Sequence, residues 1–117
     1  MRDEIETETL KDPALFYREF FLNSVDGIAL MDLQGRILEQ NQAHRELLGY
    51  SVEDLKGRSA ASHLGEETLQ GILQALKEGG TYRGEVFSKR KDGTTLHMDL
   101  VAFPIRDEKG QMFCYAT

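Results

Sequence analysis

The chain has 117 residues, of which 40% are hydrophobic and 29% charged, and its formal net charge is −6 at pH 7. This length and balance indicate one soluble domain with enough apolar material for a single core. The acidic charge argues against a nucleic-acid partner, since binding phosphates requires a surplus of Lys and Arg. No run approaches the roughly 18 apolar residues of a membrane span, so we expect this chain to make no membrane contact.

Cys114 is the only cysteine, so an internal disulfide is impossible. This indicates a reducing, cytoplasmic compartment, although a longer parent protein with a membrane anchor elsewhere stays open.

The chain begins with a polar lead-in over residues 1–12. Asp12 followed by Pro13 is typical of a helix start, and we expect a helix over residues 13–24. Its aromatic side chains repeat one helical turn apart: Phe16, Tyr17, Phe20 and Phe21. This amphipathic face would pack either on the domain's own core or partly on a second subunit.

Residues 27–31 are a short apolar run, and residues 36–40 return as a second strand after a turn that contains Gly35, so together they predict a β-hairpin. Asn41 then predicts the N-cap of a helix that ends at Gly49.

Ser51 predicts the N-cap of a second short helix, whereas residues 58–65 are expected to be irregular. Residues 66–77 predict the clearest helix, because their apolar side chains follow helical spacing: Leu69, Ile72, Leu73 and Leu76.

Residues 81–89 and 95–104 predict a long hairpin around a turn at 90–93, and residues 112–117 predict a last strand that is cut short by the chain end. Alternation in the second arm places Leu96, Met98, Leu100 and Ala102 on one face, and His97, Asp99, Val101 and Phe103 on the other. Two strands before the helices and three after them predict an α+β fold, with one antiparallel sheet and helices packed on one face. Residues 13–117 would form a single domain with its core over 25–117.

Five local patterns occur in order between residues 16 and 117: Asn23-Ser24-x-Asp26-Gly27-Ile28, Gly35-Arg36-Ile37 leading to Asn41, Leu48-Gly49-Tyr50-Ser51 with Leu55-x-Gly57, Gly84-Glu85 followed by Lys91-Asp92-Gly93, and Pro104-Ile105-Arg106-Asp107 before Gly110. In this order they resemble a PAS domain, the sensory module of bacterial signalling proteins such as sensor histidine kinases and diguanylate cyclases. The resemblance implies a five-stranded antiparallel sheet whose inner face and central helices enclose a pocket. It also implies that the outer sheet face and the N-terminal helix form dimer or inter-domain contacts.

A small organic ligand in such a pocket would contact a mostly apolar lining, for which the candidates are Leu48, Leu64, Leu69, Ile72, Leu73, Val86, Leu96, Met98 and Leu100. We favour a filled core for the same residues, because apolar periodicity does not by itself indicate a lined cavity. Polar groups would complete a binding site if their segments face inward: Tyr82, Arg83, Ser88, Ser59, Ser62 and His63.

No cofactor is expected from the resemblance. Flavin-binding light sensors of this family carry a reactive cysteine in a Gly-x-Asn-Cys-Arg-Phe-Leu-Gln segment, and the matching residues 57–64 have no cysteine. Cys114 lies on the last strand instead. Haem-binding members use a histidine of the long central helix, near Thr68 here, and residues 66–77 contain none. An unfamiliar haem or flavin site in a redox or gas sensor stays open.

The three histidines are scattered and show no metal-ligand spacing. We expect His44 and His97 to face solvent and His63 to be a partly exposed loop residue. No Ser-His-Asp set with a nucleophile elbow and no phosphate-binding glycine loop occurs, so this chain is not expected to be an enzyme.

The outer face of the second hairpin needs cover, because Val101 and Phe103 would otherwise be exposed together. We therefore expect a homodimer through the aromatic helix and this face, with contacts from Phe16, Tyr17, Phe20, Phe21, Val101 and Phe103. The chain would be the sensory or relay domain of a larger signalling protein that contains a covalently linked effector, with a sensor histidine kinase favoured over a diguanylate cyclase. The alternative is a ligand-free dimerisation or protein-interaction module.

Overall fold

The computed structural model describes residues 13–107 and 110–117. Within these ranges, the side chains at 13–14, 16–17, 106–107 and 110–112 are not described. The predicted lead-in at 1–12, its Asp12 cap, the side chains of Phe16 and Tyr17, and the turn at 108–109 therefore lie outside the described residues.

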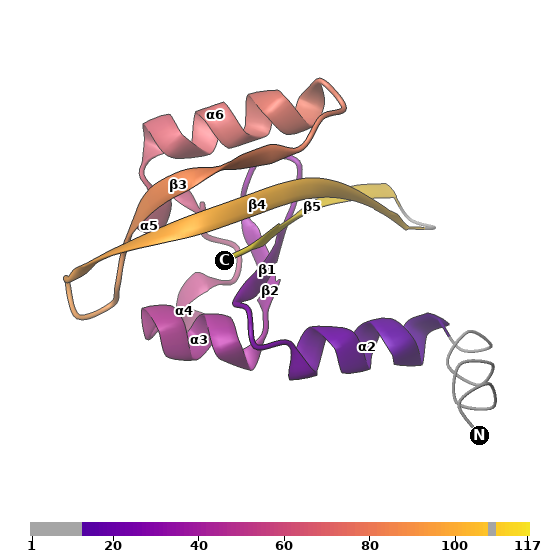
Figure 1. Ribbon diagram of the computed structural model, residues 1–117, viewed down its shortest axis with the longest axis horizontal. Helices are drawn as coiled ribbons and strands as arrows, with labels where there is room; N and C mark the ends of the chain where they lie inside the picture. Colours follow the sequence, from indigo (N-terminus) through magenta and orange to yellow (C-terminus); the bar gives the residue numbers. More distant parts are fainter. Residues whose placement is uncertain (1–12, 108–109) are drawn as a thin grey trace.

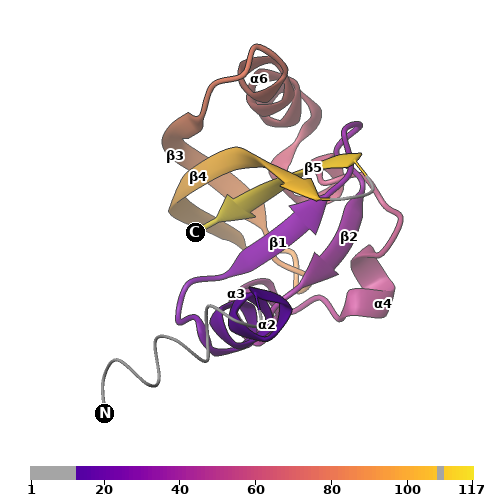
Figure 2. The same cartoon turned by 90° about the vertical axis from the view of Figure 1, so that its right-hand side faces the viewer.

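Five antiparallel strands form one sheet: β1 (Ile28–Met31), β2 (Ile37–Gln40), β3 (Tyr82–Lys89), β4 (Thr95–Asp107) and β5 (Gly110–Ala116). Their order across the sheet is β2-β1-β5-β4-β3. The last strand in sequence is thus the middle strand of the sheet, between β1 and β4 (Figure 2). The predicted α+β architecture with two strands before the helices and three after them is confirmed.

The helices are α2 (Pro13–Asn23), α3 (Gln42–Leu48), α4 (Val52–Leu55), α5 (Ala61–Leu64) and α6 (Glu66–Lys77). The predicted caps are present at both short helices. Asn41 accepts the backbone N–H of His44 at the start of α3, and Gly49 ends this helix with a φ of 84°. Ser51 and Asp54 form a reciprocal capping box on α4.

The expectation that residues 58–65 are irregular was wrong, because Ala61–Leu64 forms the single turn of α5. The hydroxyl of Ser59, just before this turn, accepts the backbone N–H of Ala61. A four-residue helix is too short to show helical periodicity, so its position depends on tertiary packing against α6 and β3.

Buried apolar side chains form two clusters, one on each face of the sheet, and helices lie on either side of the strands (Figure 1). Its inner face packs with α4, α5 and α6 into the main core, to which β5 contributes Phe113 and Tyr115. The intervening residue Cys114 points to the outer face, where it packs with Phe21 of α2 and Ile28 of β1. Alternation along the middle strand thus divides the molecule into an interior and an outer face covered in part by α2.

Candidate functional site

Asn41 joins three elements by using all four hydrogen-bonding positions of its buried side-chain amide. Its Oδ1 accepts the backbone N–H of Ile28 at 2.9 Å and that of His44 at 3.0 Å. Its Nδ2 donates to the carbonyls of Phe21 and Asp26, both at 3.0 Å. The end of α2, the start of β1 and the start of α3 are therefore held by one side chain.

His44 begins a chain of buried polar side chains on the first turn of α3. Its Nδ1 lies 2.6 Å from Gln40 Oε1, and its Nε2 lies 3.0 Å from the Tyr115 hydroxyl. Gln40 Nε2 donates to the carbonyl of Tyr50 at 2.7 Å, which fixes the orientation of the Gln40 amide. The chain thus connects α3 with the middle strand of the sheet.

His63 of α5 completes this chain from the other side of the same hydroxyl. Its Nε2 lies 2.7 Å from the Tyr115 oxygen, so one phenol contacts two imidazoles from different helices. We refer to Gln40, His44, Tyr115 and His63 as the interior polar chain. All four side chains are buried, and Tyr115 is fully excluded from solvent.

Burial determines the charge state of the interior polar chain. It lowers the pKa of His44 to about 3, with a smaller contribution from repulsion by His63. Burial likewise lowers the pKa of His63 to about 4. The pKa of Tyr115 is raised, mainly by burial and secondarily by Cys114. Every member is therefore uncharged at neutral pH, and the chain is a set of neutral hydrogen bonds.

The expectation that His44 faces solvent and that His63 is partly exposed was wrong, whereas His97 is exposed as predicted. His44 lies one helical turn before buried Leu48, and this i, i+4 relation was a signal of burial that the sequence contained. No comparable signal marked His63, because its partner Tyr115 lies 52 residues away in sequence.

Of the nine residues predicted to line a pocket, seven belong to the main core or pack against it, and two lie outside it. Buried in the main core are Leu64, Leu69, Ile72, Leu73, Val86 and Leu100, with Met98 half-buried against it. Leu48 is also buried, and Leu96 is half-buried on the hairpin. Among the polar candidates, Ser88 and His63 are buried, Tyr82 packs on the core, Ser59 is half-buried, and Arg83 and Ser62 are exposed.

An apolar groove of about 320 Å³ runs between α2 and the outer face of the sheet. Its lining residues are Phe20, Phe21, Ser24, Asp26, Ile28, Phe103, Ile105, Cys114 and Ala116. Three of the predicted interface residues, Phe20, Phe21 and Phe103, thus line one groove, and Val101 is half-buried on the same strand face. Burial raises the pKa of the Cys114 thiol to about 11, so this group is an apolar part of the wall.

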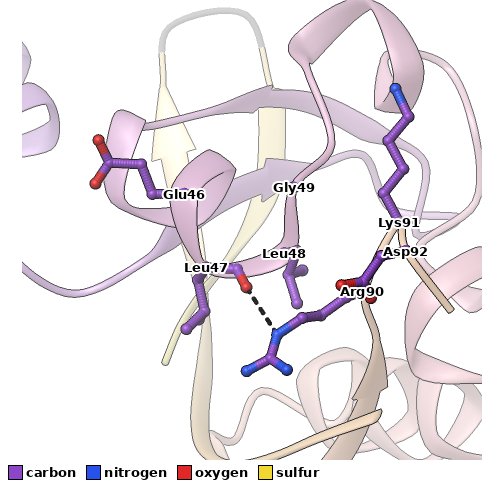
Figure 3. A pocket seen from close by; sticks show the side chains of 7 residues that line it. All are labelled: Glu46, Leu47, Leu48, Gly49, Arg90, Lys91 and Asp92. Carbon is purple, nitrogen blue, oxygen red and sulfur yellow. Dashed lines mark hydrogen bonds between the residues drawn. The ribbon is translucent and has the colours of Figure 1, made fainter. Parts of the chain in front are cut away.

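A second hollow, of about 540 Å³, lies between the end of α3 and the turn of the β3–β4 hairpin (Figure 3). Arg90 Nε donates to the carbonyl of Leu47 at 3.3 Å. The backbone N–H of Lys91 donates to the carbonyl of Leu48 at 2.9 Å. Both donors satisfy carbonyls at the end of α3, so these contacts attach the hairpin to the helix.

Among the residues that the structure describes, no group of three or more His, Cys, Asp or Glu side chains is arranged to hold a metal ion. Likewise, no helix in this described part is long and apolar enough to cross a membrane.

The family model of the PAS fold matches residues 15–116, which is nearly all of the described chain. The five-stranded sheet and its helices agree with this match. The chain belongs to the PAS family, and the PAS domain is a sensory signalling module that is not itself catalytic.

Solved structures support the same fold. The PAS domain of an HTR-like protein from Haloarcula marismortui superimposes with a TM-score of 0.76 at 25% identity, covering 97% of this chain and 96% of that one. A domain of a sensory box sensor histidine kinase/response regulator from Geobacter sulfurreducens gives a TM-score of 0.79 at 24% identity, covering 94% and 97%.

A curated relative, the nitrogen fixation regulatory protein of Klebsiella oxytoca, is 28% identical over 111 residues. The match covers 92% of this chain but only 22% of the relative. The chain therefore spans about a fifth of the length of that regulator.

Proposed function

We propose that this PAS domain is the cytoplasmic sensory and relay module of a larger signalling protein, in which a covalently linked histidine kinase effector responds to its state. A small ligand in the interior, or a neighbouring domain, would favour one arrangement of a homodimer formed through α2 and the outer sheet face. The similarity to a domain of a sensor histidine kinase/response regulator supports this choice of effector over a diguanylate cyclase.

The observation that supports the relay best is the continuity of polar contacts from the interior to α2. His63 on α5 contacts Tyr115 on β5, and Tyr115 contacts His44 on α3. The backbone of His44 binds Asn41, which in turn holds the end of α2 through the carbonyl of Phe21. A shift of α5 is thereby linked to both the middle strand and the helix that lines the outer groove.

The energy required of such a relay is small. A ligand that binds one state tenfold more tightly than the other biases their equilibrium by about 1.4 kcal/mol. Losing or forming one or two neutral hydrogen bonds is on the same scale, at about 1 kcal/mol each. The domain would therefore need no large motion.

The proposal assigns no flavin adduct to Cys114. The thiol lies on the outer face of the sheet, against Phe21 and Ile28, whereas the expected ligand space is on the inner face. Its raised pKa, about 11, also disfavours the nucleophilic thiolate.

The ligand-free interaction module stays as the second candidate. The predicted lining residues in the main core are almost completely buried, and a core packed in this way needs no ligand for stability. Both candidates use the same outer surface, so the test of that surface applies to both.

Phe103→Glu tests the dimer. Phe103 is 38% exposed and lines the outer groove, so a carboxylate there would be placed in an apolar interface. We expect sedimentation equilibrium to give a dimer dissociation constant at least tenfold higher than that of the unchanged chain, with unchanged far-UV circular dichroism.

Phe87→Glu is the matched control. Phe87 is 63% exposed on β3, where its ring stacks on His97 at a centroid distance of 4.6 Å, and it is not part of the groove lining. It should leave the sedimentation profile unchanged. An unaltered dimer in Phe103→Glu, or equal weakening in both variants, would contradict the proposed interface.

A further inference from the structure

Two buried polar atoms of the described residues have no hydrogen-bond partner: Nδ1 of His63 and Oγ of Ser88. Their side chains are only 3% and 1% exposed, respectively. An unpaired polar group in an apolar interior costs about 1–3 kcal/mol, so native proteins rarely contain one without a reason. Both atoms are in the interior where the proposed function expects a ligand.

The interior polar chain determines which hydrogen-bonding role the free atom of His63 has. Gln40 Nε2 is used as a donor to the Tyr50 carbonyl, so Gln40 Oε1 must accept from His44 Nδ1–H. His44 is neutral, which leaves its Nε2 as an acceptor for the Tyr115 hydroxyl.

The phenol of Tyr115 has a single hydrogen, which it donates to His44. Its oxygen must therefore accept from His63 Nε2–H across 2.7 Å. Because His63 is also neutral, its Nδ1 has a lone pair and no hydrogen. The unpaired atom is thus an acceptor without a donor.

The fold brings His63 and Ser88 to neighbouring elements. The short helix α5 packs against β3, and Ser88 lies on the inner face of that strand, two residues beyond buried Val86. Opposite them on β4, Leu96 pairs with Ser88 and Met98 pairs with Val86. Leu96 and Met98 are only half-buried, so the helices cover the inner face incompletely beside Ser88.

We propose that His63 of α5 and Ser88 of β3 together bind a small, largely apolar, uncharged molecule with an N–H or O–H donor, which donates to His63 Nδ1 and pairs with the Ser88 hydroxyl. This inference rests on the proposed sensory function and specifies its ligand class. Such a molecule satisfies both buried atoms without changing the rest of the interior polar chain.

A ligand that offers only acceptors is disfavoured by the same geometry. It would require hydrogen on His63 Nδ1, and a neutral ring would then have to accept at Nε2 from Tyr115. The Tyr115 hydrogen would no longer be available to His44 Nε2, which would lose its donor in a buried position. The site therefore selects donors over acceptors of equal shape.

The test uses two pairs of probes with similar shape, indole against benzofuran and phenol against anisole. The first member of each pair has a donor and the second has none. Titration of the full chain with ¹⁵N-labelled histidine should show Nε2-protonated His63 in the free protein, and a shift of its Nδ1 resonance with indole and phenol. Benzofuran and anisole should bind at least tenfold more weakly.

Ser88→Ala is the matched variant, because it removes only the unpaired hydroxyl. We expect a higher melting temperature than for the unchanged chain, together with at least fivefold weaker binding of indole and phenol. His63→Phe should abolish the donor preference, and Ser88→Ala keeps the test decisive if that larger change prevents folding.

Equal binding within each probe pair, no response to either donor probe, or an Nδ1-protonated His63 in the free protein would overturn the proposal. These results do not depend on the sedimentation of Phe103→Glu. A failed ligand class with an intact, Phe103-dependent dimer would therefore leave the relay function standing.

Discussion

At the scale of residues, the most consequential arrangement is the pair of neutral imidazoles on one buried phenol. The pKa of His44 is about 3 and that of His63 about 4, both well below the ordinary value of 6.5 for histidine. In the unfolded chain both groups are expected to regain that ordinary value. Between these limits the unfolded chain binds more protons than the folded one, so the free energy of unfolding falls as the pH falls below about 6.5.

We expect acid to weaken the fold measurably before carboxylates titrate. Between about pH 7 and pH 5, each histidine should remove about 1.5–2 kcal/mol from the free energy of unfolding. Urea denaturation at the two pH values measures this loss. A free energy of unfolding that is constant over this range would contradict the buried neutral pair.

Residues with local roles were predictable from the sequence, and residues with distant partners were not. The caps at Asn41, Gly49 and Ser51 follow from hydrogen bonds that span three or four positions, so their residue types and spacing are sufficient evidence. The bond from His63 to Tyr115 spans 52 positions and depends on how α5 is placed over the sheet. Sequence patterns contain no information on that placement.

At the scale of elements, Asn41 decides how α2 is attached to the domain. The end of this helix is held by the bond from Asn41 Nδ2 to the Phe21 carbonyl, together with the packing of Phe21 on Ile28 and Cys114. The same amide positions β1 and α3. Losing it would leave buried backbone groups of three elements without partners.

Asn41→Ala should lower the free energy of unfolding by about 2–4 kcal/mol, since it removes an N-cap and leaves buried donors and acceptors unpaired. Hydrogen exchange should show the largest loss of protection at the end of α2 and the start of α3. Asn23→Ala is the control, because the exposed Asn23 amide bonds to Glu19 of its own helix. Similar effects of both substitutions would contradict the role given to Asn41.

An element was predictable where a local signal determined its ends. α6 was predicted with both ends correct, because twelve residues contain a full set of apolar positions at helical spacing. β4 extends to Asp107, beyond the predicted end at Pro104, since its pairing with β5 is a long-range contact. The single turn of α5 is held by packing and was not expected.

At the scale of the whole molecule, the sheet has its last strand in the centre. β5 pairs with β1 on one side and with β4 on the other. Without it, the sheet would separate into the pair β2–β1 and the pair β4–β3. Isolated pairs of strands are at best marginally stable in water, so the whole fold depends on the final strand.

A chain ending at Asp107 should therefore show no cooperative thermal transition by circular dichroism. The matched control ends at Ala116, which retains every residue of β5 and removes only Thr117, whose backbone N–H donates to the carbonyl of Gly27. That control should melt cooperatively. A cooperative transition in the shorter chain would mean that the two pairs of strands associate without the central one.

The bond between Thr117 and Gly27 also has a mechanical consequence. It places the start of β1 and the end of β5 side by side at one end of an antiparallel pair. Tension that separates these two points unzips the pair, breaking its bonds one after another instead of loading them all in shear. Ile28 opposite Ala116 would open first, and Ala29 opposite Tyr115 would follow. Such tension would therefore reach Tyr115, whose hydroxyl lies between the two imidazoles, when the second residue pair opens.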